Sequence, residues 1–343
     1  MQTMHYGNDY EALYDKGRKL LKSAVFTEAA NIFLYLDTNN FGKGQLALGV
    51  MYSEGYGFSK DQKKAYDLFY KASQSGESTA DYYLGLIYLE GKGVAQNIRR
   101  SFYWFEKAAQ SGNGHAQFKL WESYRYGIGV ANSLPLALSW LKKSADNAIP
   151  EAQYILGVAQ IEGEILPANI PLGIELVIQA ANQGVIAAYH SLGYLFEEGV
   201  LVNQDLIEAV FWYKKAAEHG NLYSIVNLAA IYENGIVGEI NYIKAFELYH
   251  KAAALNFALG QYNLARMYQD GLGTNKNMNE ALRLYIKAYE NGDIKSANNI
   301  GSIYMGKSGF PVNLHEAERW LRLGASHGDI IASKNLENLL SHH

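Results

Sequence analysis

Hydrophobic and small side chains recur along the chain at a fixed step of 36 residues (84 − 48 = 36). A leucine or isoleucine marks each copy, a small residue stands four positions before it, and an aromatic residue stands four positions after it in every copy except the fourth, which has Gln160. Such offsets place the side chains on one helical face, so the pattern predicts a first helix, helix A, in each copy. The marker residues are Leu48, Leu84, Leu120, Leu156, Leu192, Leu228, Leu264 and Ile300.

The other half of each copy predicts a second helix, helix B. It opens on Asp, Asn or Ser, whose side chains accept hydrogen bonds from the unpaired N–H groups of a helix start. Small and bulky residues then alternate, which lets neighbouring helices approach and interdigitate. In six copies a glycine predicts the end of helix B in a left-handed conformation. The predicted caps are Asp61, Asn97, Ser133, Asn169, Asp205, Asn241, Asn277 and Asn313.

Copies such as "LGLIYLEGKGVAQNIRRSFYWFEKAAQSG" (84–112) and "EAVFWYKKAAEHG" (208–220) resemble the Sel-1-like repeat family, a branch of the tetratricopeptide superfamily. The resemblance extends over about residues 42 to 340. It implies an all-α fold: an α-solenoid, wound as a right-handed superhelix, of about eight 36-residue antiparallel helix pairs with a concave inner face. It also implies a role as an adaptor or scaffold for other proteins, as in many bacterial members.

Three segments follow from this periodicity. Residues 1–41 contain "EALYDKGRKLLKSAVFTEAANIFLYL", which predicts two helices and a degenerate N-terminal capping repeat. Residues 42–328 hold the eight repeats, and residues 329–343 are expected to form a C-terminal capping helix and tail.

Some positions depart from the pattern. Trp121 stands where helix A otherwise has a small residue, so the third repeat must pack differently there or point the ring outward. The segment 162–173 lacks the second glycine of the turn and carries Pro167 and Pro171, which predicts a reshaped turn. The segment "GEINYIKAF" (238–246) also lacks the usual spacing.

A Gly-Lys-Gly sequence, Gly91 to Gly93, could in principle hold a phosphate, since glycine lets backbone N–H groups approach an anion. The same glycine pair recurs between helix A and helix B around Tyr56, Ile128 and Leu272 in place of Lys92. The pair is therefore interpreted as a turn.

The formal charge is −4, and no basic block is present. Phosphate backbones require dense Lys/Arg patches, so binding of nucleic acid, including RNA by a helical repeat, is not expected. Cysteine is absent, which excludes disulfides and thiolate chemistry. The N-terminus shows no signal-peptide pattern, and no apolar stretch reaches the roughly 20 residues that span a bilayer. These features predict a cytoplasmic protein without membrane insertion, or a periplasmic one if a leader had been removed.

No catalytic constellation stands out. The nine histidines show no metal-binding spacing, and nucleophile-elbow and Walker motifs are missing. We therefore expect no enzyme activity, no metal and no cofactor. The aromatic column could form an aromatic cage or a base-stacking track, but its regular spacing on the packing face favours core filling.

Partner binding is expected on helix A, which lines the inner face in the superfamily. Its positions outside the packing columns vary in chemistry from copy to copy, as protein-binding surfaces do. The main contact surface is predicted between Glu122 and Gln269, for a protein or peptide partner and a monomeric chain. An adaptor role and an immunity- or inhibitor-type role against a toxin or enzyme both fit this surface. The candidate residues are Leu86, Leu89, Glu122, Arg125, Tyr126, Ile161, Tyr194, Glu197, Glu233, Arg266 and Gln269.

Overall fold

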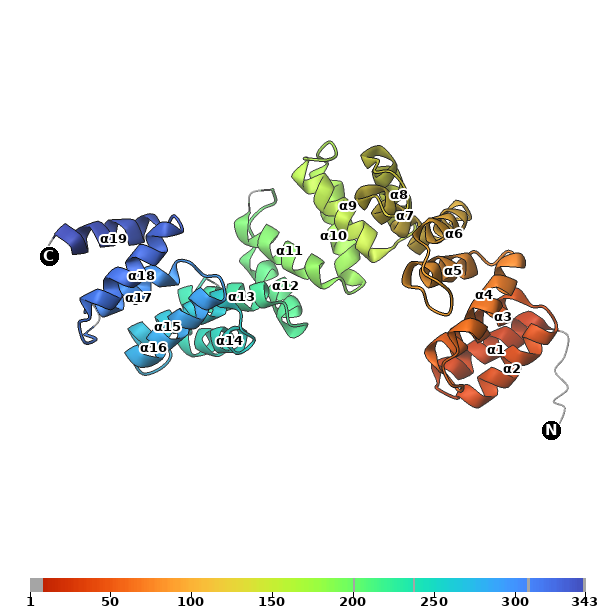
Figure 1. Cartoon of the computed structure of the whole chain (residues 1–343), viewed down its shortest axis with the longest axis horizontal. Helices are drawn as coiled ribbons and strands as arrows, with labels where there is room; N and C mark the ends of the chain where they lie inside the picture. The colour runs from red at the N-terminus through yellow and green to blue at the C-terminus, as the bar shows by residue number, and fades with distance from the viewer. Residues whose placement is uncertain (1–8, 200, 237, 307–308, 342–343) are drawn as a thin grey trace. The chain divides into compact units, whose positions relative to one another are not determined.

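The computed structural model describes residues 9–199, 201–236, 238–306 and 309–341, which form 19 helices and no strand (Figure 1). The predicted all-α repeat fold is confirmed. By its internal contacts the chain divides into two compact units, Met1–Ala180 (unit 1) and Ala181–His343 (unit 2). The division falls within α10 (Ile170–Asn182).

Unit 1 is a series of helix hairpins, each packed on the next (Figure 1). The first hairpin consists of α1 (Tyr10–Lys22) and α2 (Phe26–Thr38), as predicted for the N-terminal segment. The repeats follow as helix A and helix B in turn. They are α3 (Gly42–Glu54) with α4 (Gln62–Gln74), α5 (Ser78–Glu90) with α6 (Ile98–Gln110), α7 (Gly114–Tyr126) with α8 (Leu134–Asp146), and α9 (Pro150–Glu162) with α10.

Unit 2 continues the same order. Its last helix, α19 (Ile330–Ser341), packs on both helices of the final hairpin and covers it. The hairpins are α11 (Ile186–Glu198) with α12 (Leu206–Glu218), α13 (Leu222–Asn234) with α14 (Tyr242–Ala254), α15 (Ala258–Asp270) with α16 (Met278–Glu290), and α17 (Ser296–Tyr304) with α18 (Leu314–Ser326).

The predicted helix boundaries follow from local capping. Seven of the eight predicted helix-B caps accept a hydrogen bond from a backbone N–H of the first turn. Ser133 is the N-cap residue of α8, as predicted, but its side chain does not make the expected hydrogen bond. Pro135, the second residue of α8, has no N–H, which removes one of the two donors that a cap residue uses.

Helix B ends in the left-handed conformation in every repeat, and the six predicted glycines adopt it. The other two repeats place Ala148 (φ 57°) and Asn256 (φ 58°) at the same position. Alanine in this conformation is strained, since its Cβ crowds the backbone.

Close packing of helix A on helix B depends on a small residue in helix A. A Cβ added to Gly85 would lie 2.4 Å from the ring of Phe105, so only glycine fits there. The same close approach joins Gly49 to Phe69 and Gly193 to Tyr213. The aromatic column of helix A lies in or against this core, as predicted; its members Tyr52 and Tyr88, for example, are buried.

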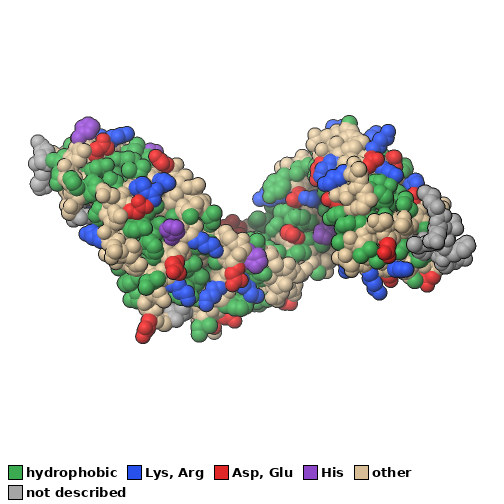
Figure 2. All heavy atoms as spheres, turned by 90° about the horizontal axis from the view of Figure 1, so that it is seen from below, with side chains coloured by type: hydrophobic (Ala, Val, Ile, Leu, Met, Phe, Trp, Pro, Cys, Tyr) green, Lys and Arg blue, Asp and Glu red, His purple; other side chains and the backbone are tan. Residues whose placement is uncertain are grey.

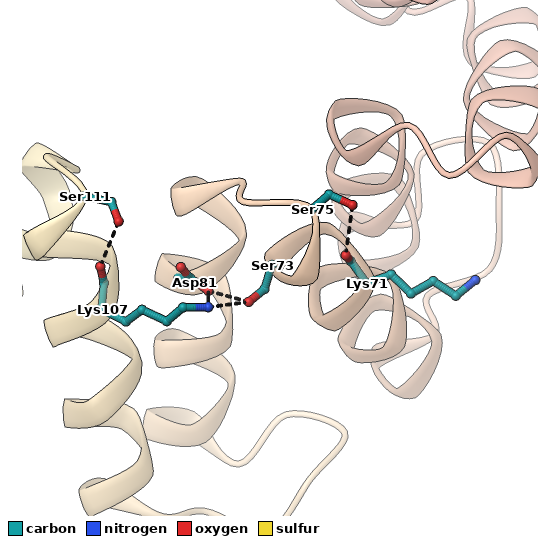
Figure 3. A network of polar contacts seen from close by, with 6 residues as sticks. All are labelled: Lys71, Ser73, Ser75, Asp81, Lys107 and Ser111. Carbon is teal, nitrogen blue, oxygen red and sulfur yellow. Dashed lines mark hydrogen bonds and ion pairs between the residues drawn. The ribbon is translucent and has the colours of Figure 1, made fainter.

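A buried polar cluster joins three successive helices of unit 1 (Figure 3). Asp81 on α5 is almost fully buried, and the Ser73 hydroxyl of α4 donates to its carboxylate at 2.5 Å. Lys107 reaches from α6, and its Nζ lies 2.9 Å from both the Asp81 carboxylate and the Ser73 hydroxyl. Because these partners satisfy the buried charge, the cluster fixes how the second repeat sits on the first.

Candidate functional site

All predicted binding residues lie on helix A, at positions two, five or six after the marker leucine. We call these positions the helix-A surface. Leu86, Leu89, Glu122, Arg125, Tyr126 and Ile161 belong to unit 1, and the remaining five belong to unit 2. The predicted set therefore forms two surfaces, one in each unit. The predicted residues of each unit include aromatic or aliphatic side chains and charges of both signs. On the face of the molecule drawn in Figure 2, hydrophobic, basic and acidic side chains are likewise interspersed, with no large patch of a single charge.

In unit 1 the predicted residues differ in how open they are. Leu86 and Leu89 are half-buried and pack against the cluster around Phe105. The Glu122 carboxylate forms an ion pair with Lys119 at 2.6 Å. Arg125 and Tyr126 are exposed, with 63% of Tyr126 open to solvent.

Arg125 and Tyr126 border an apolar groove of about 280 Å³ formed by α7, α8, α9 and the turn after α9. Its floor consists of buried side chains, and its rim of exposed ones. Among the described residues that line it, Arg125 is the one that carries a charge. We call it the Trp121 groove. Trp121, Leu141 and Ala159 form the floor, and Tyr126, Leu134 and Ile165 form the rim.

The same place one repeat earlier is nearly closed. There the cavity measures about 30 Å³. Leu89 takes the place of Arg125 in its lining, and Phe102 and Phe105 take the places of Leu138 and Leu141. A cavity of that size has room for about one or two water molecules and not for a side chain. The groove is therefore a property of the third and fourth repeats and not of the repeat pattern itself.

The first cause of the groove is Trp121. Its ring points into the core with 9% exposed, packing in one hydrophobic cluster with Phe118 and Leu141. Of the two alternatives left open by the sequence, the structure supports altered packing over an outward ring. Leucine at position 141, where Phe105 stands one repeat earlier, leaves room for the indole.

The second cause is Ile165, which occupies the position of the second turn glycine. In the second repeat that glycine, Gly93, has φ 76°, and an added Cβ would lie 2.6 Å from the carbonyl oxygen of Gln62 on the preceding helix B. Gln62 precedes Gly93 by 31 residues, as Leu134 precedes Ile165 (93 − 62 = 165 − 134 = 31). Because Ile165 has a side chain, its backbone cannot approach Leu134 in this way, and both side chains border open space.

Unit 2 has a polar helix-A surface built around three buried tyrosines of helix B. Each tyrosine hydroxyl donates to a side chain 16 residues earlier on helix A. The pairs are Tyr213 with Glu197 at 2.6 Å, Tyr249 with Glu233 at 3.0 Å, and Tyr285 with Gln269 at 3.4 Å. Unit 1 has Phe69 and Phe105 in this column, so the hydroxyls appear only where helix A supplies an acceptor.

Glu233 is the most buried of the predicted residues. Its carboxylate accepts a hydrogen bond from Tyr249 and pairs with the Arg266 guanidinium at 2.5 Å. Glu233 therefore orients Arg266 and does not present a free carboxylate to a partner. Burial and the neighbouring carboxylates Glu197 and Glu233 raise the pKa of Tyr213 and Tyr249, so both hydroxyls keep their protons and remain donors.

Two features complete the helix-A surface of unit 2. Tyr194 is 54% exposed, which makes it the most open of the predicted residues in this unit. Asn227 donates to the hydroxyl of Tyr213 at 3.0 Å, and asparagines recur at this position as Asn263 and Asn299. This surface offers hydrogen-bonding groups where unit 1 offers an apolar groove.

Sequence reasoning missed Leu134, Leu138, Ile155 and Ile165 as surface-forming residues, as well as the three tyrosines of helix B. A signal was present for Ile165, which aligns with Gly57, Gly93 and Gly129 at the 36-residue step. The described parts of the chain contain no group of three or more His, Asp or Glu side chains that could hold a metal ion. None of the described helices has the length and apolar character needed to cross a membrane.

The Sel1 repeat family model matches residues 42–77, 78–113, 114–148, 150–185, 186–221, 222–257, 258–293 and 294–329. Among solved structures, a protective antigen of uropathogenic Escherichia coli with an SLR fold is 29% identical, with a TM-score of 0.60 over 91% of this chain and 74% of the other. A Sel1 repeat protein from Oxalobacter formigenes is 28% identical, with a TM-score of 0.63 over 71% of this chain and 99% of the other. No curated protein matches the chain. With eight matched repeats, the chain belongs to the Sel1 repeat family.

Proposed function

We propose that the protein is a non-catalytic scaffold that binds a segment of another protein on its helix-A surfaces. Sel1 repeat proteins are protein-interaction scaffolds, which supports this class of function. The observation that carries the proposal is the contrast within α7 and within α11. The packing columns are buried, while Arg125, Tyr126 and Tyr194 at neighbouring positions remain open to solvent. Exposed aromatic and arginine side chains are the types that most often anchor protein interfaces.

The test is affinity capture from the source cell with the full chain, followed by mass spectrometry. Arg125→Glu in unit 1 and Tyr194→Ala in unit 2 each change one helix-A surface. The matched control variants are Arg99→Glu and Tyr103→Ala on helix B, where both side chains are also exposed.

We expect a partner that is lost with a helix-A variant and retained with both controls. Circular dichroism establishes that each variant is folded. Capture that is equal for all four variants would contradict the proposal. The purified partner also distinguishes the two roles considered from the sequence: an enzyme whose turnover stops in the complex indicates an inhibitor, and a partner whose activity is unchanged indicates an adaptor.

A further inference from the structure

We infer that the Trp121 groove binds a protein segment in which one large apolar side chain is followed or preceded closely by an aspartate or glutamate. This inference rests on the proposed function and specifies the partner of one surface. The apolar side chain enters the groove, and the carboxylate pairs with Arg125.

The volume and lining of the groove indicate the apolar anchor. At about 280 Å³ it lies below the roughly 300–1,000 Å³ typical of cofactor and drug sites, and fits one or two side chains. Its floor is apolar, because the buried side chains of Trp121, Leu141 and Ala159 form it. Its rim exposes Leu134 and Ile165, which a bound side chain would cover. Burial of apolar surface in such a closed floor is what makes a few anchor residues dominate binding.

The charge at the groove indicates the acidic neighbour. Arg125 is exposed, and no ion pair to it is found among the described residues. The nearest acid of its helix, Glu122, is held by Lys119. A carboxylate of the partner can therefore form two parallel hydrogen bonds with the guanidinium without displacing an existing contact.

At the positions of Trp121 and Arg125 no other repeat has a tryptophan or an arginine, although the turn glycine is also replaced in the fifth repeat, by Leu201. In the second repeat, Leu89 replaces Arg125 and Glu90 replaces Tyr126. The turn glycine that follows, Gly129 of the third repeat, packs closely on helix B of the second repeat. Leucine offers no charge to a carboxylate, and Glu90 would repel one. The features that open the groove and the feature that supplies its charge thus occur together at one place.

The test begins with a phage-displayed random peptide library selected on the full chain. We expect the enriched sequences to share a leucine, phenylalanine or another large apolar residue within a few positions of Asp or Glu. Isothermal titration calorimetry with a synthetic copy of one selected peptide then measures the variants. Arg125→Glu should weaken binding by about tenfold or more, as expected for the loss of a charge-assisted pair. Arg99→Glu, which changes the net charge equally on helix B, should leave it within about twofold.

Two further measurements separate a specific pair from a general charge effect. A peptide in which lysine replaces the acidic residue should bind Arg125→Glu better than the parent chain. Ile165→Gly and Tyr126→Glu, which restore the residues of other repeats, should each weaken the original peptide by about tenfold.

Selected peptides that bind equally to the parent chain and to the Arg125, Tyr126 and Ile165 variants would overturn this inference. If Tyr194→Ala abolished their binding, the proposed scaffold function would still stand on unit 2. Self-association of the chain that Tyr126→Glu abolishes would identify a second copy as the occupant and would equally overturn the inference. Failure of both the library and the cellular capture would contradict the scaffold function itself.

Discussion

Trp121 and Leu141 should behave as an exchangeable pair, because the first two repeats fill the same space with glycine and phenylalanine. Trp121→Gly removes a buried indole, and such truncations cost about 3–5 kcal/mol. Glycine within a helix adds roughly 1 kcal/mol. Leu141→Phe alone forces a ring into a site that Trp121 already fills, and such overpacking destabilises a protein by about 1–3 kcal/mol.

Together the two changes recreate the Gly85–Phe105 pair of the preceding repeat. The phenyl ring would fill the space left by the indole, so the stability of the double variant should differ from that of the parent chain by no more than about 2 kcal/mol. The energetic coupling between the two positions is then at least about 3 kcal/mol, at the upper end for residues in contact.

Native-state hydrogen exchange of α7 and α8 is the suitable assay, since repeat proteins open locally and one global midpoint would average over all repeats. The free energy of opening of α7 amides should fall in Trp121→Gly and recover in the double variant. Amides of α15 serve as an internal control and should not change. Additive effects of the two substitutions, or a loss below about 1 kcal/mol for Trp121→Gly, would refute this account of the packing.

Three other changes test the structure. Ala148→Gly should stabilise the chain by about 0.5–1 kcal/mol, seen as a higher urea midpoint, because it relieves a left-handed alanine; Gly112→Ala at the equivalent position should do the opposite. Tyr249→Phe should lower the free energy of opening of α13, measured by hydrogen exchange of its amides, by about 1 kcal/mol, because it removes the hydrogen bond to Glu233 and keeps the ring. An unchanged free energy of opening would mean that this bond contributes nothing. Asp81→Ala should lower the free energy of opening of α5, again measured by hydrogen exchange, by about 2 kcal/mol, because Ser73 and Lys107 lose their shared acceptor. An unchanged free energy of opening would contradict a structural role for this cluster.

The repeat architecture could be predicted from the sequence because its determinants are local. A cap such as Asn97 bonds three residues ahead, and a glycine such as Gly112 ends a helix by its own conformation. The uninterrupted step of 36 residues carries these local signals through the whole array. Ser133 shows the limit, since its neighbour Pro135 changes the capping of the same helix.

The site could be predicted only in part, because its determinants lie far apart in the chain. The sequence marks both Trp121 and the missing turn glycine as departures. Their convergence on one groove depends on how the fold places residues that are 20 and 31 positions apart in the chain. Glu233 likewise reads as an exposed binding residue. Its burial depends on Tyr249, 16 residues later, and on Arg266, 33 residues later.

The contact between a turn glycine and the preceding helix B also bears on how such proteins diversify. Where the glycine is kept, as at Gly93, the turn packs directly on the backbone of the preceding hairpin and leaves no space between them. Where a larger residue replaces the glycine, as at Ile165, this close backbone packing is lost at one junction between hairpins, and the helices before and after the turn still form. An array of uniform hairpins can therefore acquire a new recognition point through a few substitutions at one junction between hairpins, as at Trp121, Arg125 and Ile165 here.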